Sequence, residues 1–261
     1  MKVLSEKNAS ALFGAEIPST KERVSFRPMT VGMRKTLAKF AIGDDTPEEM
    51  IKFQTAKMAL LKTLCISGLD DRKLTEIDFI SLLACVRNNS SIDDLILNMT
   101  CGNAECKKEF TYNVDFEGII DRCSKFEFKK SEHVFKDRQG TSYRIVLEYP
   151  SAMDAVAISD MVVDMGPEEF KLTYPYIFVK SIFIEDDEIE DFAGQSLAKR
   201  IEIVDGLPGE ILYNVSENNL YKVVYDDFGA DNIMNLYGEL KCPGCGKDME
   251  GVVTSDNFFT I

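Results

Sequence analysis

The sequence contains a single histidine, His133, and no tryptophan among its 261 residues. Most metallohydrolase sites, and the serine and cysteine triads, need an imidazole as a metal ligand or general base. Here one histidine would have to fill every such role. The glycine-rich loops that bind phosphates and the Gly-x-Ser-x-Gly turn of hydrolases are also absent. We therefore expect a protein that is not an enzyme, with His133 as a surface residue rather than a catalyst.

Basic residues are scarce, because 30 lysines and arginines face 44 aspartates and glutamates, which gives a formal net charge of −14. Nucleic acids and anionic membrane surfaces both attract proteins through a basic face. Long apolar runs are missing too: residues 172–179 end at Lys180, far short of the roughly 20 residues of a spanning helix. Residues 1–8 lack the apolar core of a secretory signal. The sequence predicts a cytosolic protein that binds neither nucleic acid nor membranes.

The seven cysteines are unevenly distributed along the chain. Four form two close pairs, Cys101 with Cys106 and Cys242 with Cys245. The other three stand alone in apolar or mixed surroundings and are expected to be small core residues: Cys65, Cys85 and Cys123. A chain of this length does not need disulfides to fold, so paired cysteines indicate a metal site.

Each cysteine pair lies between two strand-like segments, and we interpret the pairs as two zinc knuckles. Thiolates are soft ligands that favour a tetrahedral zinc site, and Pro243 and Gly244 suit a tight turn. Two knuckles complete one site of the zinc-ribbon kind, with Cys101, Cys106, Cys242 and Cys245 as ligands. Four thiolates close the coordination shell, so the zinc would be structural. Cysteine turns without metal, and a redox-active thiol pair, remain as alternatives.

The hydrophobic pattern has helical period in the first ninety residues and changes to alternation at about residue 92. Capping residues and periodicity predict helices that begin at Thr30, Thr46 and Thr75, and later ones over 151–163, 195–204 and after Pro208. Alternation predicts strands near 24–27, 95–101, 110–116, 126–128, 143–147, 176–184, 233–240 and 251–254. The acidic run 185–191 is expected to be a solvated turn, because it lacks the order of a calcium loop.

These elements predict an α+β fold with an inserted mixed α/β region. The expected parts are an N-terminal arm (1–22), a helical segment (23–92), two zinc-ribbon halves (93–120 and 232–261) and an inserted α+β region (121–231). Because the arm is polar, we expect it to become ordered against another molecule. The apolar segment 257–261 is expected either to dock on a partner or to pack on its own sheet.

One further pattern is the phrase Val-Ser-Phe-Arg-Pro-Met-Thr-Val at 24–31. Two helices rich in Leu and Lys follow it, then a third helix that ends near Asn88 and a hairpin at 95–114 around Cys101 and Cys106. This arrangement resembles the baseplate hub and hub-assembly protein family of contractile-tailed, T-even-like bacteriophages. In that family an Arg-Pro-Phe-Thr-Val phrase precedes a helical segment, so Met29 replaces the expected Phe. The resemblance covers about 22–120 and the second cysteine pair, but not 124–240.

The resemblance implies a non-enzymatic component of the tail baseplate, at or near the hub. Its partners would be other baseplate or tail proteins in a hetero-oligomeric assembly, and its location the virion, after assembly in the cytoplasm of the host bacterium. One alternative is a transient chaperone for assembly of the hub or tape-measure protein, absent from the mature virion. Another is a zinc-ribbon nucleic-acid-binding or transcription factor. The net charge argues against this last alternative, although Lys107 and Lys108 follow the first cysteine pair.

Overall fold

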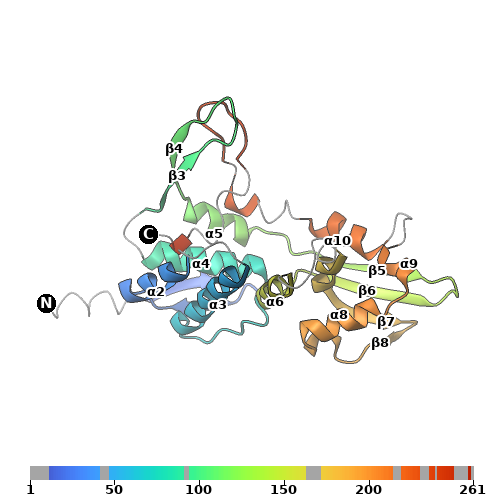
Figure 1. The fold of residues 1–261 in the computed structure, drawn as a ribbon. Coiled ribbons are helices and arrows are strands. Elements are labelled where there is room, and N and C mark those ends of the chain that lie inside the picture. Colours follow the sequence, from blue (N-terminus) through green and yellow to red (C-terminus); the bar gives the residue numbers. More distant parts are fainter. Residues whose placement is uncertain are drawn as a thin grey trace. The chain divides into compact units, whose positions relative to one another are not determined.

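The computed structural model (Figure 1) describes residues 12–41, 47–90, 94–162, 172–213, 219–229, 235–238, 240–249 and 258–259. The chain forms two compact units. Unit 1 comprises residues 1–126 and 231–261, and unit 2 comprises residues 127–230. The fold is mixed α and β, and the strand pairs of the described residues are all antiparallel. Within these residues no helix is long and apolar enough to cross a membrane.

Unit 1 is built around one buried helix. Its described elements are β1 (Phe13–Glu16), β2 (Arg23–Phe26), α2 (Val31–Ala41), α3 (Pro47–Leu64), α4 (Glu76–Ser90), β3 (Ile96–Thr100), β4 (Glu109–Asn113), α5 (Phe116–Ser124) and η3 (Asn235–Tyr237). Residues 77–87 of α4 are buried on every side, as expected of a helix enclosed by its neighbours. Helices α3 and α5 and strand β1 pack against it.

The three predicted helices of this unit are present, and local contacts explain two of their starts. The Thr30 hydroxyl accepts a hydrogen bond from the N–H of Met33 at the start of α2 (3.3 Å). Thr75 and Asp78 form a reciprocal capping box at the start of α4. The N–H of Asp78 donates to the Thr75 hydroxyl (3.2 Å), and the N–H of Thr75 donates to the Asp78 carboxylate (2.8 Å). Thr46, the expected cap of α3, lies outside the described residues.

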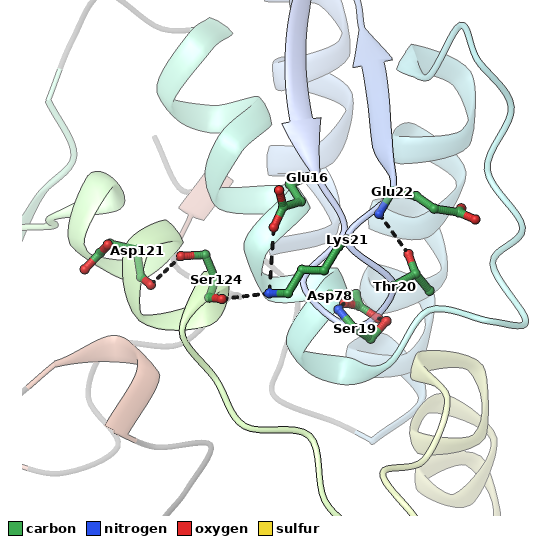
Figure 2. A network of polar contacts seen from close by, with 8 residues as sticks. All are labelled: Glu16, Ser19, Thr20, Lys21, Glu22, Asp78, Asp121 and Ser124. Carbon is green, nitrogen blue, oxygen red and sulfur yellow. Dashed lines mark hydrogen bonds and ion pairs between the residues drawn. The ribbon is translucent and has the colours of Figure 1, made fainter.

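The turn between β1 and β2 is fixed to α4 and α5, as Figure 2 shows. The buried carboxylate of Asp78 accepts hydrogen bonds from the N–H (2.8 Å) and hydroxyl (2.6 Å) of Ser19. Lys21 donates to the carbonyl of Ser124 (2.8 Å) and forms an ion pair with Glu16 (3.7 Å). Residues 12–22 therefore pack within unit 1. The expectation of an arm ordered against another molecule is wrong for them, and residues 1–11 lie outside the described part.

Phe258 and Phe259 are fully buried in unit 1. The ring of Phe258 lies edge-on to Phe116, with centroids 5.0 Å apart, and its carbonyl accepts a hydrogen bond from Nε of Arg87 (2.9 Å). Of the two expectations for this apolar segment, docking on a partner is wrong for these two residues, which pack within their own chain. The contacts are with α4, α5 and η3 rather than with a sheet.

Unit 2 contains a four-stranded sheet in the order β5-β6-β7-β8. Its described elements are β5 (Lys130–Lys136), β6 (Ser142–Glu148), α6 (Ala152–Val162), η1 (Tyr174–Phe178), β7 (Val179–Ile184), β8 (Asp187–Glu188), η2 (Phe192–Gly194), α8 (Leu197–Asp205), α9 (Gly209–Tyr213) and α10 (Leu220–Phe228). The ring of Phe228 packs against Tyr149 (4.9 Å) and Phe178 (5.3 Å), which joins α10 to the sheet. Arg200 and Asp154 form a part-buried ion pair between α8 and α6.

Four predictions of local structure are wrong or incomplete. Phe116 begins α5 instead of ending a strand, because the Asp115 carboxylate caps the helix by accepting from the N–H of Gly118 (2.9 Å). No strand forms at 126–128, since α5 runs to Ser124. The stretch 176–184 begins as the 3₁₀ helix η1 and becomes strand only at Val179. A strand was predicted over 233–240, but the described residues of this range contain the 3₁₀ helix η3. The strand predicted over 251–254 lies outside the described residues.

Candidate metal centre

The first cysteine turn connects β3 to β4, whose residues pair in antiparallel register from Ile96 with Asn113 to Thr100 with Glu109. The N–H of Cys101 donates to the carbonyl of Lys108 (2.9 Å), and that of Cys106 donates to the carbonyl of Asn103 (2.9 Å). The Asn103 side chain also accepts from the N–H of Glu105 (3.1 Å). The turn is thus closed by its own hydrogen bonds, as the predicted hairpin requires.

The second cysteine turn has a similar construction. The N–H of Cys242 donates to the carbonyl of Lys247 (3.0 Å), and the N–H of Gly246 donates to the carbonyl of Cys242 (2.8 Å). In both turns the residue after the second cysteine has a positive φ: 46° at Lys107 and 71° at Gly246. Glycine adopts a positive φ without strain, whereas the Cβ atom of a lysine makes this conformation unfavourable.

The two turns bring all four paired cysteines together, and Figure 1 shows the second turn, in red, beside the β3–β4 hairpin. The sulfurs of Cys101 and Cys245 are 3.7 Å apart, as are those of Cys106 and Cys242. All four sulfurs lie within 4.8 Å of one another. Each close pair joins one cysteine from each turn. Among the described residues, this is the group of His, Cys, Asp and Glu side chains that could hold a metal ion.

Gly244 makes this close approach possible. A Cβ atom at this position would lie 2.8 Å from Cδ of Lys108 and 3.0 Å from the sulfur of Cys106. A larger residue would require the flexible side chain of Lys108 to move away and the sulfur of Cys106 to shift by a few tenths of an ångström. The N–H of Gly244 also donates to the sulfur of Cys242 (3.3 Å).

The electrostatics of the cluster favour a bound cation. Burial opposes ionisation of Cys242, but the N–H groups of Cys245 and Gly244 stabilise its thiolate and lower the pKa of Cys242 to about 6. At Cys101 the N–H of Asn103 favours the thiolate. Burial and the neighbouring thiols outweigh it and raise the pKa of Cys101 to about 12. Four thiolates this close repel one another. A divalent metal ion would offset that repulsion and release the remaining protons.

The three unpaired cysteines lie outside the cluster and are buried, as predicted. Burial raises the pKa of Cys123 to about 12 and that of Cys85 to about 11. A thiol with such a pKa is almost entirely protonated near neutral pH and is a poor nucleophile. The side chain of Cys65 contacts the hydroxyl of Ser67 (3.5 Å).

Two weaker candidates from the sequence have other roles. His133 is half-buried rather than simply on the surface, and its Nε2 lies 2.8 Å from Oδ2 of Asp227, which joins β5 to α10. The acidic run 185–191 contains the short strand β8, which pairs antiparallel with β7. In the part of the chain that the structure describes, the run does not belong to a group that could hold a metal.

The sequence did not reveal the residue that holds the segment before the second turn. Arg122 of α5 donates from Nε to the carbonyl of Leu236 in η3 (2.8 Å). Its guanidinium lies under Gly238, where φ is +86° and a Cβ would be 3.1 Å from Nη2. A glycine directly after the apolar pair Leu236–Tyr237 was a visible signal for a turn. The sequence did not indicate that Arg122 contacts this turn, because Arg122 is more than a hundred positions away.

Fold and site together define a mixed α and β protein with antiparallel sheets and a candidate metal centre between two distant chain segments. The family model described as T4 bacteriophage base plate protein matches residues 12–259. The chain therefore belongs to this family, which confirms the resemblance seen in the sequence. The match also spans 124–240, where the sequence alone gave no resemblance. No curated protein and no solved structure gave a match.

Proposed function

We propose that this protein is a structural component of a bacteriophage tail baseplate, at the hub or next to it, and that it acts through contacts with other proteins. The observation that carries the proposal is the family match over residues 12–259. Its partners would be other baseplate or tail proteins in a hetero-oligomeric assembly. It would be assembled in the cytoplasm of the host bacterium and retained in the virion.

We further propose that Cys101, Cys106, Cys242 and Cys245 bind one structural zinc ion. A Zn–S bond of about 2.3 Å places neighbouring sulfurs of a tetrahedron about 3.8 Å apart. The two short sulfur–sulfur distances of 3.7 Å agree with this value. Four thiolates also match the preference of zinc for soft ligands. They leave no coordination position for water, so the ion would support the fold.

The zinc would hold together the two chain segments between which unit 2 is inserted. Cys106 and Cys242 are 136 positions apart, and closing so long a loop costs conformational entropy. A metal that binds only the closed form adds its binding free energy to the stability of that form.

Mass spectrometry of purified phage particles tests the baseplate role. We expect this chain in the mature particle at a ratio to a known baseplate subunit that stays constant through successive purification steps. An abundant host protein from the same lysate serves as the control for contamination. If the chain is present in infected cells but lost from purified particles, it is an assembly chaperone and not a baseplate component.

A further inference from the structure

Four side chains from distant parts of the sequence meet in the core of unit 1. We call Arg87, Phe116, Tyr237 and Phe258 the base cluster. The ring of Phe258 lies 5.0 Å from that of Phe116 and 6.2 Å from that of Tyr237, in edge-on geometry. Arg87 lies over the ring of Phe116 at 5.7 Å and donates to the carbonyl of Phe258 at 2.9 Å. All four residues are buried, with Phe258 at 0% exposure and Arg87 at 1%.

Two members of the base cluster, Phe116 and Tyr237, lie on chain segments next to the cysteine turns. Phe116 follows β4, the strand that leaves the first cysteine turn, after two intervening residues. Tyr237 ends η3, five residues before Cys242. Phe258 contacts both rings, so it joins the segment after the first turn to the segment before the second. The hydrogen bond from Arg122 to Leu236 ties the same two segments (2.8 Å).

We propose that Phe258 is a positioning residue for the metal centre: by joining Phe116 to Tyr237, it holds the two cysteine turns close enough to share one ion. This inference rests on the proposed metal site. Phe258 touches no metal ligand in the contacts described, so its effect would pass through the two chain segments. Binding of the metal and burial of Phe258 then stabilise each other.

The physical basis is the cost of bringing the turns together. A site whose halves are far apart in sequence must close a long loop before the ion can bind all four sulfurs. The base cluster keeps that loop closed in the metal-free chain. The free energy of metal binding therefore does not have to offset the whole conformational entropy of closing the loop. Coupling between two binding events is reciprocal. Zinc should therefore protect the Phe258 segment, and loss of Phe258 should weaken zinc binding.

Arg87 makes release of this segment costly. Its side chain is almost fully buried, and its Nε–H donates to the carbonyl of Phe258. If the segment leaves, this donor loses its acceptor inside the core, which is unfavourable for a charged group. The two phenyl rings of Phe258 and Phe259 would at the same time become exposed to water. The segment should therefore stay bound when metal is present and open more readily when it is removed.

Zinc affinity of the full chain, measured by competition with a chromogenic chelator, tests the proposal. Phe258→Ala should weaken zinc binding by about tenfold or more, a typical size for coupling between sites. Stoichiometry at saturation should be unchanged, as should the visible spectrum of the cobalt-substituted protein, because the ligands are intact. Phe258→Leu, which keeps a buried apolar side chain, should restore most of the affinity.

Phe192→Ala is the matched control, since Phe192 is equally buried but belongs to unit 2. It should lower the melting temperature without changing zinc affinity. If Phe258→Ala also leaves the affinity unchanged, the coupling is wrong although the metal site stands. A wild-type chain that takes up no zinc overturns both the site and the coupling.

A second measurement needs no variant, in case Phe258→Ala does not fold. Hydrogen exchange of the wild-type chain reports opening at the backbone amides of Phe258 and Phe259. Addition of zinc should slow exchange at these amides by about tenfold, while amides of β5 and β6 in unit 2 serve as the internal reference. Equal exchange with and without bound zinc would contradict the proposal.

Discussion

At the scale of single residues, Gly244 is the point where the two cysteine turns pack most tightly. It has no side chain to separate Cys106 and Lys108 from the second turn. Gly102 in the first turn differs, because a Cβ there would meet nothing within 4 Å and its φ is not positive. Both glycines lie between the cysteines of a turn, but their spatial surroundings differ.

We predict that Gly244→Ala weakens zinc binding by roughly tenfold or more, a size common for residues that support metal ligands. The added methyl group would lie 3.0 Å from the sulfur of Cys106, so this ligand atom would have to shift by a few tenths of an ångström. Gly102→Ala should leave zinc affinity unchanged, which makes it the control. Both can be measured by chelator competition. Equal affinities for the two variants would show that the turns do not need this close approach.

The sequence sufficed to select the four cysteines, because pairs with a short spacing between strand-like segments are visible locally. It could not reveal what supports them. Arg87 and Phe258 are 171 positions apart, and Arg122 and Leu236 are 114 positions apart. Neither pair leaves a local pattern, because its two members are far apart in the sequence. Only tertiary packing shows that these two arginines bind backbone carbonyls.

At the scale of secondary-structure elements, Asp78 connects the β1–β2 turn to the start of α4 (Figure 2). Its carboxylate is fully buried and accepts from the N–H and hydroxyl groups of both Ser19 and Thr75, at 2.6–2.8 Å. We predict that Asp78→Ala lowers the free energy of unfolding by about 2–4 kcal/mol, because four donors lose their acceptor. Denaturant unfolding of the purified chain measures this.

Asp121→Ala is the control for that experiment. The Asp121 carboxylate is exposed and forms an ion pair with Lys125 at 2.6 Å in an i,i+4 arrangement. Exposed pairs of this kind contribute about 0.3–0.5 kcal/mol. If Asp78→Ala costs no more than Asp121→Ala, the buried carboxylate does not anchor the turn.

In unit 2, the contact between Asp227 and His133 should make stability depend on pH. Burial opposes ionisation of Asp227, but polar contacts with Ser131 and His133 outweigh it and lower the pKa of Asp227 below its usual 3.8. A lowered carboxyl pKa contributes stability above the pKa of the unfolded chain. This contribution disappears as the pH falls through the lower pKa of the folded chain.

We predict that Asp227→Asn destabilises the protein by about 1 kcal/mol at pH 7 and by less as the pH falls below about 4. Thermal unfolding at several pH values gives the difference between variant and wild type. Asp226→Asn provides the comparison, because Asp226 is exposed and pairs only at the surface with Lys222 (2.9 Å). A difference for Asp227→Asn that stays constant with pH would be inconsistent with the lowered pKa.

The prediction of elements succeeded where caps and periodicity agreed. Thr30 and Thr75 start helices as expected, and β6 contains the predicted strand at 143–147. Helix α5 was missed because Phe116 continues the alternation of the preceding strand, so the capping signal of Asp115 was overlooked. The sequence predicted one helix after Pro208, where the described residues form both α9 and α10.

At the scale of the whole molecule, the negative charge is concentrated in unit 2. Residues 127–230 contain 21 acidic and 10 basic side chains, so they account for −11 of the total of −14. Unit 1, which carries the cysteine turns and their lysines, is much closer to neutral. A strongly acidic unit disfavours phosphate backbones and favours basic partner surfaces.

We predict that the purified, zinc-loaded chain does not bind duplex or single-stranded DNA at physiological salt. Proteins that do so neutralise phosphates with several clustered lysines or arginines. A gel-shift titration measures the affinity, and repetition at lower salt shows whether binding is electrostatic. Micromolar or tighter binding with a steep dependence on salt would instead favour the nucleic-acid-binding alternative.

The central claim is that the two distant cysteine pairs form one closed zinc site. X-ray absorption spectroscopy at the zinc edge of the purified full chain tests it most directly, together with the zinc content of the same sample. We predict one zinc per chain with four sulfur neighbours at about 2.3 Å and no oxygen or nitrogen neighbour. A mixed shell with light-atom ligands, or a chain free of zinc after expression with ample metal, would contradict the claim.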